Sequence, residues 1–95
     1  MMPDHVESLI HIFDAVVALG HYNVAESIYS SIMNLDSNNY IFYHKYANYC
    51  EMIGKSEMAE TYYLKSLKIN PNFVLGLIDY ASFLSKNNQN SIAEK

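Results

Sequence analysis

The chain has 95 residues, the length of a single domain. Ten acidic residues against six basic ones, all of them lysines, give a net charge of −4. A net-acidic chain without arginine is poorly suited to binding nucleic acid or an anionic membrane surface. Hydrophobic residues make up 51% of the sequence, which excludes intrinsic disorder, and a single cysteine excludes a disulfide framework.

The N-terminal residues lack the basic start and the uninterrupted apolar stretch of a secretory signal. No segment approaches the roughly 20 apolar residues that cross a membrane. These two observations predict a soluble, intracellular protein of the cytoplasm.

Two helical stripes of apolar residues open the chain, the first over residues 6–17 and the second over 22–33. Asp4 can cap the first helix, and Glu7 three residues later completes a capping-box arrangement. Gly20 stands where the C-terminal glycine of a helix belongs. The Asp-Ser-Asn-Asn run after the second stripe is a cluster of turn-forming residues, so a helical hairpin is predicted.

A second hairpin is predicted to follow directly. Its first helix covers residues 40–52 and ends at Gly54. Ser56 can cap its second helix, which runs to about Ile69. Pro71 is suited to the first turn of the helix that comes next.

The next helix is predicted over residues 73–86, and it is apolar nearly all round. Such a helix needs cover on every side, which the rest of a longer chain, a second copy or a partner would supply. The polar run at 87–90 predicts a break, after which residues 91–95 begin a sixth helix.

The chain repeats itself with a period of about 34 residues. Turn, small, acidic and aromatic residues all keep this phase. The matching sets are Gly20 and Gly54; Ala25, Ala59 and Ala93; Glu26, Glu60 and Glu94; Tyr29 and Tyr63; Asn38 and Asn72; and Tyr46 with Ala47 against Tyr80 with Ala81. A chance match would not hold several residue classes in phase together.

This pattern resembles the tetratricopeptide repeat family, whose unit is a helix–turn–helix of about 34 residues. Segment 59–72 is the part most similar to the family pattern. The resemblance implies an all-α fold in which helical hairpins stack as a right-handed superhelix, an α-solenoid fragment. It divides the single domain, residues 1–95, into an atypical unit at 6–39, a complete unit at 40–73 and a partial unit at 74–95.

The first unit departs from the family pattern. Phe13 and Ile32 stand where small residues are usual, and Ser37 replaces the closing proline. Terminal repeats are often atypical because one face has no neighbour, so we expect the first unit to be an N-terminal cap.

The resemblance implies a non-catalytic scaffold that binds a protein or peptide and needs no cofactor. In this family the first helices of successive units line a concave groove. The groove positions carried over to this chain are Glu7, Ile10, His11, Asp14, Ile41, His44, Lys45, Asn48, Leu75, Ile78, Asp79 and Ser82, together with Val17, Glu51 and Ser85. The isoleucines and the leucine would form an apolar floor, and the charged and amide side chains would read the partner.

A peptide with an apolar anchor and a basic residue is the predicted partner, since the segment 1–39 carries five carboxylates and no lysine. The alternatives are that contact uses other faces, or that these positions are solvated without a ligand. The family's clamp for C-terminal carboxylates is not predicted. Ile10 and Asp14 replace two of its residues in the first frame, and Asp79 would repel a carboxylate in the next.

Glu7, His11 and Asp14 share one helix face, and His44 lies one unit further on. Metal sites use such spacing, but without an HExxH-type motif a solvated polar stripe is favoured, and no metal is predicted. Protonation of the histidines below roughly pH 6.5 would weaken binding of a cationic ligand. Cys50 is predicted as a core residue, and the lack of a catalytic motif or phosphate loop predicts no enzyme activity.

An assembly role is the alternative function. The apolar third unit, with Phe83 and Leu84, would then form the interface of a homo-oligomer, or the chain would be the N-terminal part of a larger repeat protein. Groove substitutions would leave the oligomeric state unchanged, whereas aspartates at these two positions would disrupt it.

Overall fold

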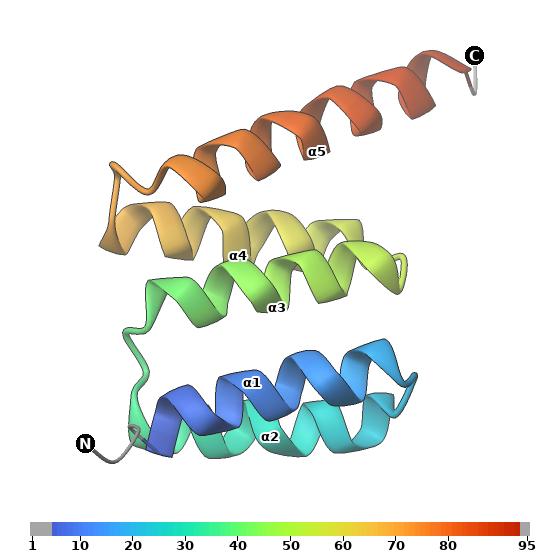
Figure 1. Ribbon diagram of the computed structural model, residues 1–95. Coiled ribbons are helices and arrows are strands. Elements are labelled where there is room, and N and C mark those ends of the chain that lie inside the picture. Colours follow the sequence, from blue (N-terminus) through green and yellow to red (C-terminus); the bar gives the residue numbers. More distant parts are fainter. Residues whose placement is uncertain (1–4, 94–95) are drawn as a thin grey trace.

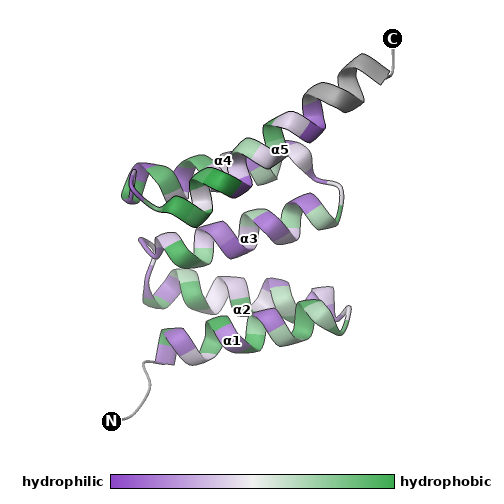
Figure 2. Ribbon diagram, turned by 45° about the horizontal axis from the view of Figure 1, so that its top comes forward, coloured by the Kyte–Doolittle hydropathy of each residue, from purple (hydrophilic) through white to green (hydrophobic). Residues whose placement is uncertain are grey.

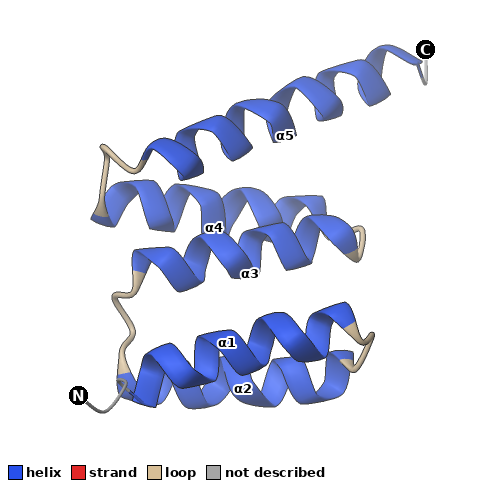
Figure 3. Ribbon diagram, viewed as in Figure 1, coloured by secondary structure: helices blue, strands red, loops and turns tan. Residues whose placement is uncertain are grey.

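The computed structural model describes residues 5–93, so Asp4, the predicted first cap, lies outside the described residues. Within that range the chain forms helices and turns and no strand (Figure 3). The helices are α1 (His5–Ala18), α2 (Tyr22–Leu35), α3 (Tyr40–Met52), α4 (Ser56–Ile69) and α5 (Val74–Ala93). The predicted all-α fold of helical repeats is confirmed.

The helices form two antiparallel hairpins, with the fifth helix laid on the second hairpin (Figure 1). α1 packs against α2, and α3 packs against α4. α3 also contacts α1, which stacks the second hairpin on the first, and α5 contacts α4. The molecule is elongated, with extents of 52 × 31 × 19 Å, as expected when each unit touches only its neighbours.

A glycine ends the first helix of each hairpin. Gly20 and Gly54 have φ angles of +82° and +84°, a region that side chains with a β-carbon avoid. The Gly20 N–H donates to the Val17 carbonyl at 3.0 Å, and the next N–H along donates to the Val16 carbonyl at 2.9 Å. The N–H groups of Gly54 and of the residue after it make the same two hydrogen bonds. The two hairpin turns, one repeat apart, therefore have the same backbone structure.

The turn between the hairpins is held by its own side chains. Asn39 accepts a hydrogen bond from the Phe42 N–H at 3.0 Å and so caps α3. Asp36 accepts from the Asn38 N–H at 3.3 Å and from the Asn39 side-chain amide at 3.4 Å. The predicted turn is therefore also a helix cap.

Three predicted helix ends differ from the structure. Ser56 is the first residue of α4 rather than its cap, and Lys55 at the cap position makes no side-chain hydrogen bond. Pro71 lies in the turn before α5. α5 continues through residues 87–90 to Ala93, so the predicted break and separate sixth helix are wrong. The run contains neither Gly nor Pro, and Asn and Gln lower helix propensity without ending a helix.

Aromatic side chains fill the space between the hairpins. Phe13 is 1% exposed and packs edge-on against Phe42 and Tyr49, with ring centroids 5.0 and 5.6 Å away. Ile32 is fully buried as well. Large residues thus occupy both positions where the family pattern has small ones, and their burial stabilises the fold.

α5 is little covered over the part whose side chains the structure describes, residues 74–87. Five of its large apolar side chains are between 39% and 63% exposed: Val74, Leu75, Leu77, Ile78 and Leu84. Strongly hydrophobic residues gather along its first half (Figure 2). None of the described helices combines the length and the apolar character needed to cross a membrane.

Candidate partner-binding groove

Helices α1, α3 and α5 carry the residues predicted to line the groove. On α1 these residues recur at spacings of three and four, which places them on one helix face. An open hollow of about 410 Å³ lies between α1 and the start of α3. Its lining residues are Glu7, Ile10, His11, Asn39, Ile41 and Lys45.

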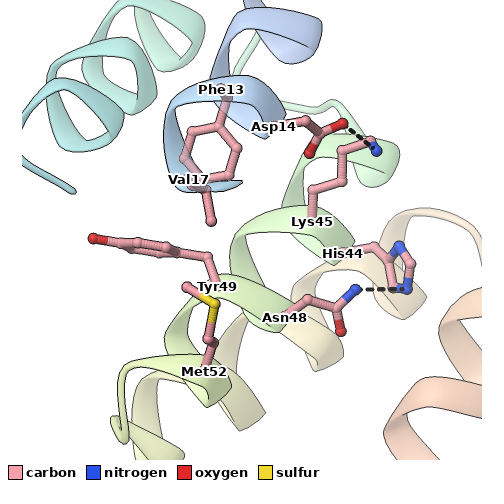
Figure 4. A pocket seen from close by; sticks show the side chains of 8 residues that line it. All are labelled: Phe13, Asp14, Val17, His44, Lys45, Asn48, Tyr49 and Met52. Atoms are coloured by element: carbon pink, nitrogen blue, oxygen red, sulfur yellow. Dashed lines mark hydrogen bonds and ion pairs between the residues drawn. The ribbon is translucent and has the colours of Figure 1, made fainter. Parts of the chain in front are cut away.

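A second hollow, of about 220 Å³, continues along the same two helices (Figure 4). Its lining residues are Phe13, Asp14, Val17, His44, Lys45, Asn48, Tyr49 and Met52. Because Lys45 lines both hollows, together they form one groove between α1 and α3. The structure therefore brings the predicted positions of the first two units together.

Charged and polar side chains join α1, α3 and α5 across this face. Lys45 Nζ lies 2.7 Å from Asp14 Oδ2. His44 Nε2 is hydrogen-bonded to Asp79 Oδ2, and the Asn48 amide donates to the same oxygen at 3.5 Å. We name this set, Asp14, Lys45, His44, Asn48 and Asp79, the polar ladder.

Glu51 lies beside the polar ladder and is also engaged. Its Oε2 is 3.4 Å from Lys86 Nζ on α5. The buried Tyr63 hydroxyl is 2.6 Å from Asn48 Oδ1 and 2.9 Å from Glu51 Oε1. Burial first, and the hydrogen bond to Glu51 second, raise the pKa of Tyr63, so this hydroxyl stays a donor.

Most of the charged side chains that were predicted to contact a partner are bonded to one another in the polar ladder. Glu7 is an exception, since its side chain is 65% exposed and, among the described residues, its basic neighbour is His11, 3.9 Å away. An exposed ion pair contributes about 1 kcal/mol at most, so this contact hardly competes with a partner for the carboxylate. Glu7 is therefore the groove carboxylate most open to a basic partner residue.

The predicted apolar floor divides into a buried and an exposed part. Ile10 is 7% exposed and belongs to the core. Ile41, Leu75 and Ile78 are 43%, 61% and 56% exposed. Ser82 is exposed too. Three large apolar side chains on α3 and α5 are thus free to meet a partner.

Comparison with known families agrees with this architecture. Residues 62–95 match a family model described as tetratricopeptide repeat. The resemblance to the tetratricopeptide repeat family is confirmed. The match indicates a protein–protein interaction repeat, a class that is generally non-catalytic. No curated protein matches the chain.

The match covers the later part of α4, the following turn and α5. In this tetratricopeptide repeat segment Phe83 is 1% exposed, with its ring 5.4 Å from that of Tyr63 and 6.3 Å from that of Tyr80. The prediction that Phe83 forms an assembly face is wrong, because this side of α5 is turned towards α4. Leu84 is 39% exposed and remains accessible.

Reasoning from the sequence missed a contact that joins successive helical units. The Tyr46 hydroxyl donates to Glu26 Oε1 at 2.9 Å, and the Tyr80 hydroxyl donates to Glu60 Oε2 at 3.2 Å. Both members of the second pair lie one full repeat after their counterparts. The sequence period shows that the glutamate and the tyrosine both recur in the next unit. It does not show that they contact each other, because that depends on how the units stack.

Cys50 lies in the hydrophobic core as predicted, with no exposed surface. Burial, followed by the nearby Glu26 carboxylate, raises the pKa of the thiol to about 11. A thiol that stays protonated is a poor nucleophile. Among residues 5–93, no three His, Cys, Asp or Glu side chains gather where they could hold a metal ion.

Proposed function

We propose that the chain is a non-catalytic module that binds a segment of a partner protein along α1, α3 and α5. The proposal rests on Ile41, Leu75 and Ile78, which are 43–61% exposed on these helices, Ile41 in the groove wall itself. Clusters of exposed apolar side chains mark surfaces that bind other proteins. Full burial of one such side chain against a partner contributes about 1.5–3 kcal/mol.

The proposed partner segment has an apolar anchor and a basic residue. The anchor would pack on Ile41 and Ile78, and the basic residue would lie against Glu7, the most accessible groove carboxylate. The histidines contribute differently from one another. Protonation of His11 would repel a basic residue at Glu7, whereas protonation of His44 would strengthen its bond to Asp79.

A displayed random-peptide library selected on the full chain tests this proposal. Synthetic copies of the selected peptides are titrated calorimetrically into the wild type and into an Ile41→Ser, Ile78→Ser variant. We expect this variant to bind about tenfold more weakly or worse. The matched control is Leu35→Ser, Leu64→Ser, which removes side chains that are 54% and 48% exposed on α2 and α4.

The control should bind within about twofold of the wild type, because α2 and α4 lie outside the proposed face. Glu7→Gln should weaken only those peptides that contain a basic residue. An equal loss of peptide affinity in the Ile41→Ser, Ile78→Ser variant and in the control would contradict the proposal. A library that yields no binder would contradict it as well.

Self-association is a second candidate function, favoured by the exposed apolar side chains of α5. A second copy of the chain would cover Leu77 and Leu84, which are 45% and 39% exposed. Light scattering after size exclusion at several concentrations should then show a dimer or larger species. The variant Leu77→Ser, Leu84→Ser, which leaves the buried Phe83 in place, should be a monomer. A wild-type monomer at every concentration would remove this candidate.

A further inference from the structure

An open hollow of about 410 Å³ lies where the α2–α3 turn meets the last turns of α4. Its lining residues are Asn38, Tyr43, Lys65, Lys68 and Ile69. It shares no lining residue with the groove between α1 and α3. Any binding here is therefore a separate property from the proposed groove function.

Two lysines bring positive charge to this hollow. Lys65 and Lys68 are three residues apart on α4, which places them on the same helix face. The described residues form ion pairs with Lys45 and Lys86, but none with these two lysines. Like charges so placed repel one another, and an anion between them removes the repulsion.

The Lys65 ammonium is held in place by aromatic rings. Its Nζ lies 5.6 Å from the ring centroid of Tyr43 and 5.1 Å from that of Tyr62. Such cation–π contacts contribute even at exposed sites. A charge that is already positioned loses less conformational freedom when a ligand binds, which favours binding.

The remaining lining groups limit what the hollow can accept. The Tyr43 hydroxyl donates to the Ser37 carbonyl, so it offers no proton to a ligand. The nearby Asp36 is already engaged by the N–H of Asn38 within the turn. Ile69 is 40% exposed and supplies apolar contact beside the two ammonium groups.

We propose that this hollow, between Lys65 and Lys68, is a docking site for an acidic segment of a partner protein, with a carboxylate between the two ammonium groups. Charge complementarity identifies the partner, since both lysines of this hollow are without an ion pair among the described residues and no acidic residue lines the hollow. An apolar residue next to the carboxylate would pack on Ile69.

Fluorescence anisotropy with a labelled oligoglutamate peptide that ends in leucine tests the proposal. An oligoglutamine peptide with the same ending and inorganic phosphate are the other probes. The variant Lys65→Gln, Lys68→Gln should bind oligoglutamate about three- to thirtyfold more weakly. The control Lys55→Gln, Lys86→Gln has the same net charge and should bind within about twofold of the wild type. Lys65→Arg, Lys68→Arg should retain binding, and circular dichroism checks that each variant is folded.

An equal loss in the two glutamine variants would overturn the proposal, because only net charge would then matter. Binding of oligoglutamine as tight as that of oligoglutamate would overturn it as well. Displacement of oligoglutamate by phosphate at equal concentration would show a site for free anions rather than for a protein segment. The groove variants Ile41→Ser and Ile78→Ser should leave oligoglutamate binding unchanged, so this test is independent of the proposed groove function.

Discussion

Helices α3 and α5 stand one repeat apart in equivalent places of their units, yet they differ in how much they bury. Ala47 of α3 has no exposed surface, and its counterpart Ala81 on α5 is exposed. Cys50 is fully buried, and its counterpart Leu84 is 39% exposed. Phe83 is an exception, since it is as buried as Tyr49, its counterpart in α3.

The difference in burial between α3 and α5 follows from how many helices pack against each. α3 packs between α1 and α4, whereas α5 packs on α4 (Figure 1). The repeat pattern thus determines which residue type stands at a position, and the neighbouring helices determine whether it is buried. Equivalent residues on α3 and α5 therefore provide matched pairs for experiments, in which sequence context is similar and burial is not.

The largest expected effect is unfolding by alkali, which should depend on the aromatic core around α3. Burial, with a hydrogen bond second in each case, raises the pKa of Tyr29 and of Tyr49 to about 12, and the pKa of Tyr46 also lies above its ordinary value. An unfolded tyrosine has a pKa of about 10, so the folded state holds its protons more tightly. The stability that this provides is complete below about pH 10 and is lost as the pH rises towards 12.

Far-ultraviolet circular dichroism and tyrosinate absorbance, followed together during an alkaline titration, measure this effect. The two signals should change in one transition between about pH 10 and pH 12. Tyr80→Phe, which alters the less buried α5, should leave the transition in place. Ionisation of most tyrosines near pH 10 with the helical signal intact would contradict the prediction.

The next largest effect should come from adding the same side chain at Ala47 and Ala81. Ala47→Leu forces three carbon atoms into a filled core and should lower the free energy of unfolding by about 1–3 kcal/mol. Ala81→Leu points into solvent and should change it by less than about 0.5 kcal/mol. Leucine and alanine have similar helix propensities, so the pair reports packing. Urea denaturation of both variants measures the difference, and equal losses would contradict our account of burial.

Most of the fold could be predicted from the sequence because local signals and the repeat agree. The bounds predicted for the helix over 40–52 are those of α3, and the predicted end at Ile69 is the end of α4. Gly20 and Gly54 end helices as predicted, since their position in the period and their conformational freedom point to the same structure. The break at 87–90 was wrong because polar residues alone do not end a helix.

The candidate site could be predicted only in part. Helical periodicity placed Glu7 and His11 on one face, and both line the groove. Periodicity does not say which side chains of successive units meet, so the bond between His44 and Asp79 was not foreseen. It also does not separate the two sides of an apolar helix, which is why Phe83 was mistaken for a surface residue.

The smallest expected effect is the difference in stability between removing the first and the second tyrosine–glutamate contact. Tyr46→Phe removes a hydroxyl that lies 2.9 and 3.1 Å from the two oxygens of Glu26, on a side chain that is 2% exposed. We expect it to lower the free energy of unfolding by about 1–1.5 kcal/mol. Tyr80→Phe removes a longer bond, 3.2 Å to Glu60, at a half-buried position, and water can replace it. The loss at Tyr80 should be about 0.5 kcal/mol or less, the lower end for a hydrogen bond that water can replace.

A double-mutant cycle sharpens this last comparison. Tyr46→Phe is combined with Glu26→Gln, Tyr80→Phe is combined with Glu60→Gln, and urea denaturation gives the coupling energy of each pair. Coupling should be larger for Tyr46 and Glu26, because a bond to a charged group is stronger where water is excluded. Equal coupling energies in the two pairs would contradict this expectation. They would mean that the strength of the contact is set within the repeat itself and does not depend on the helices that cover α3.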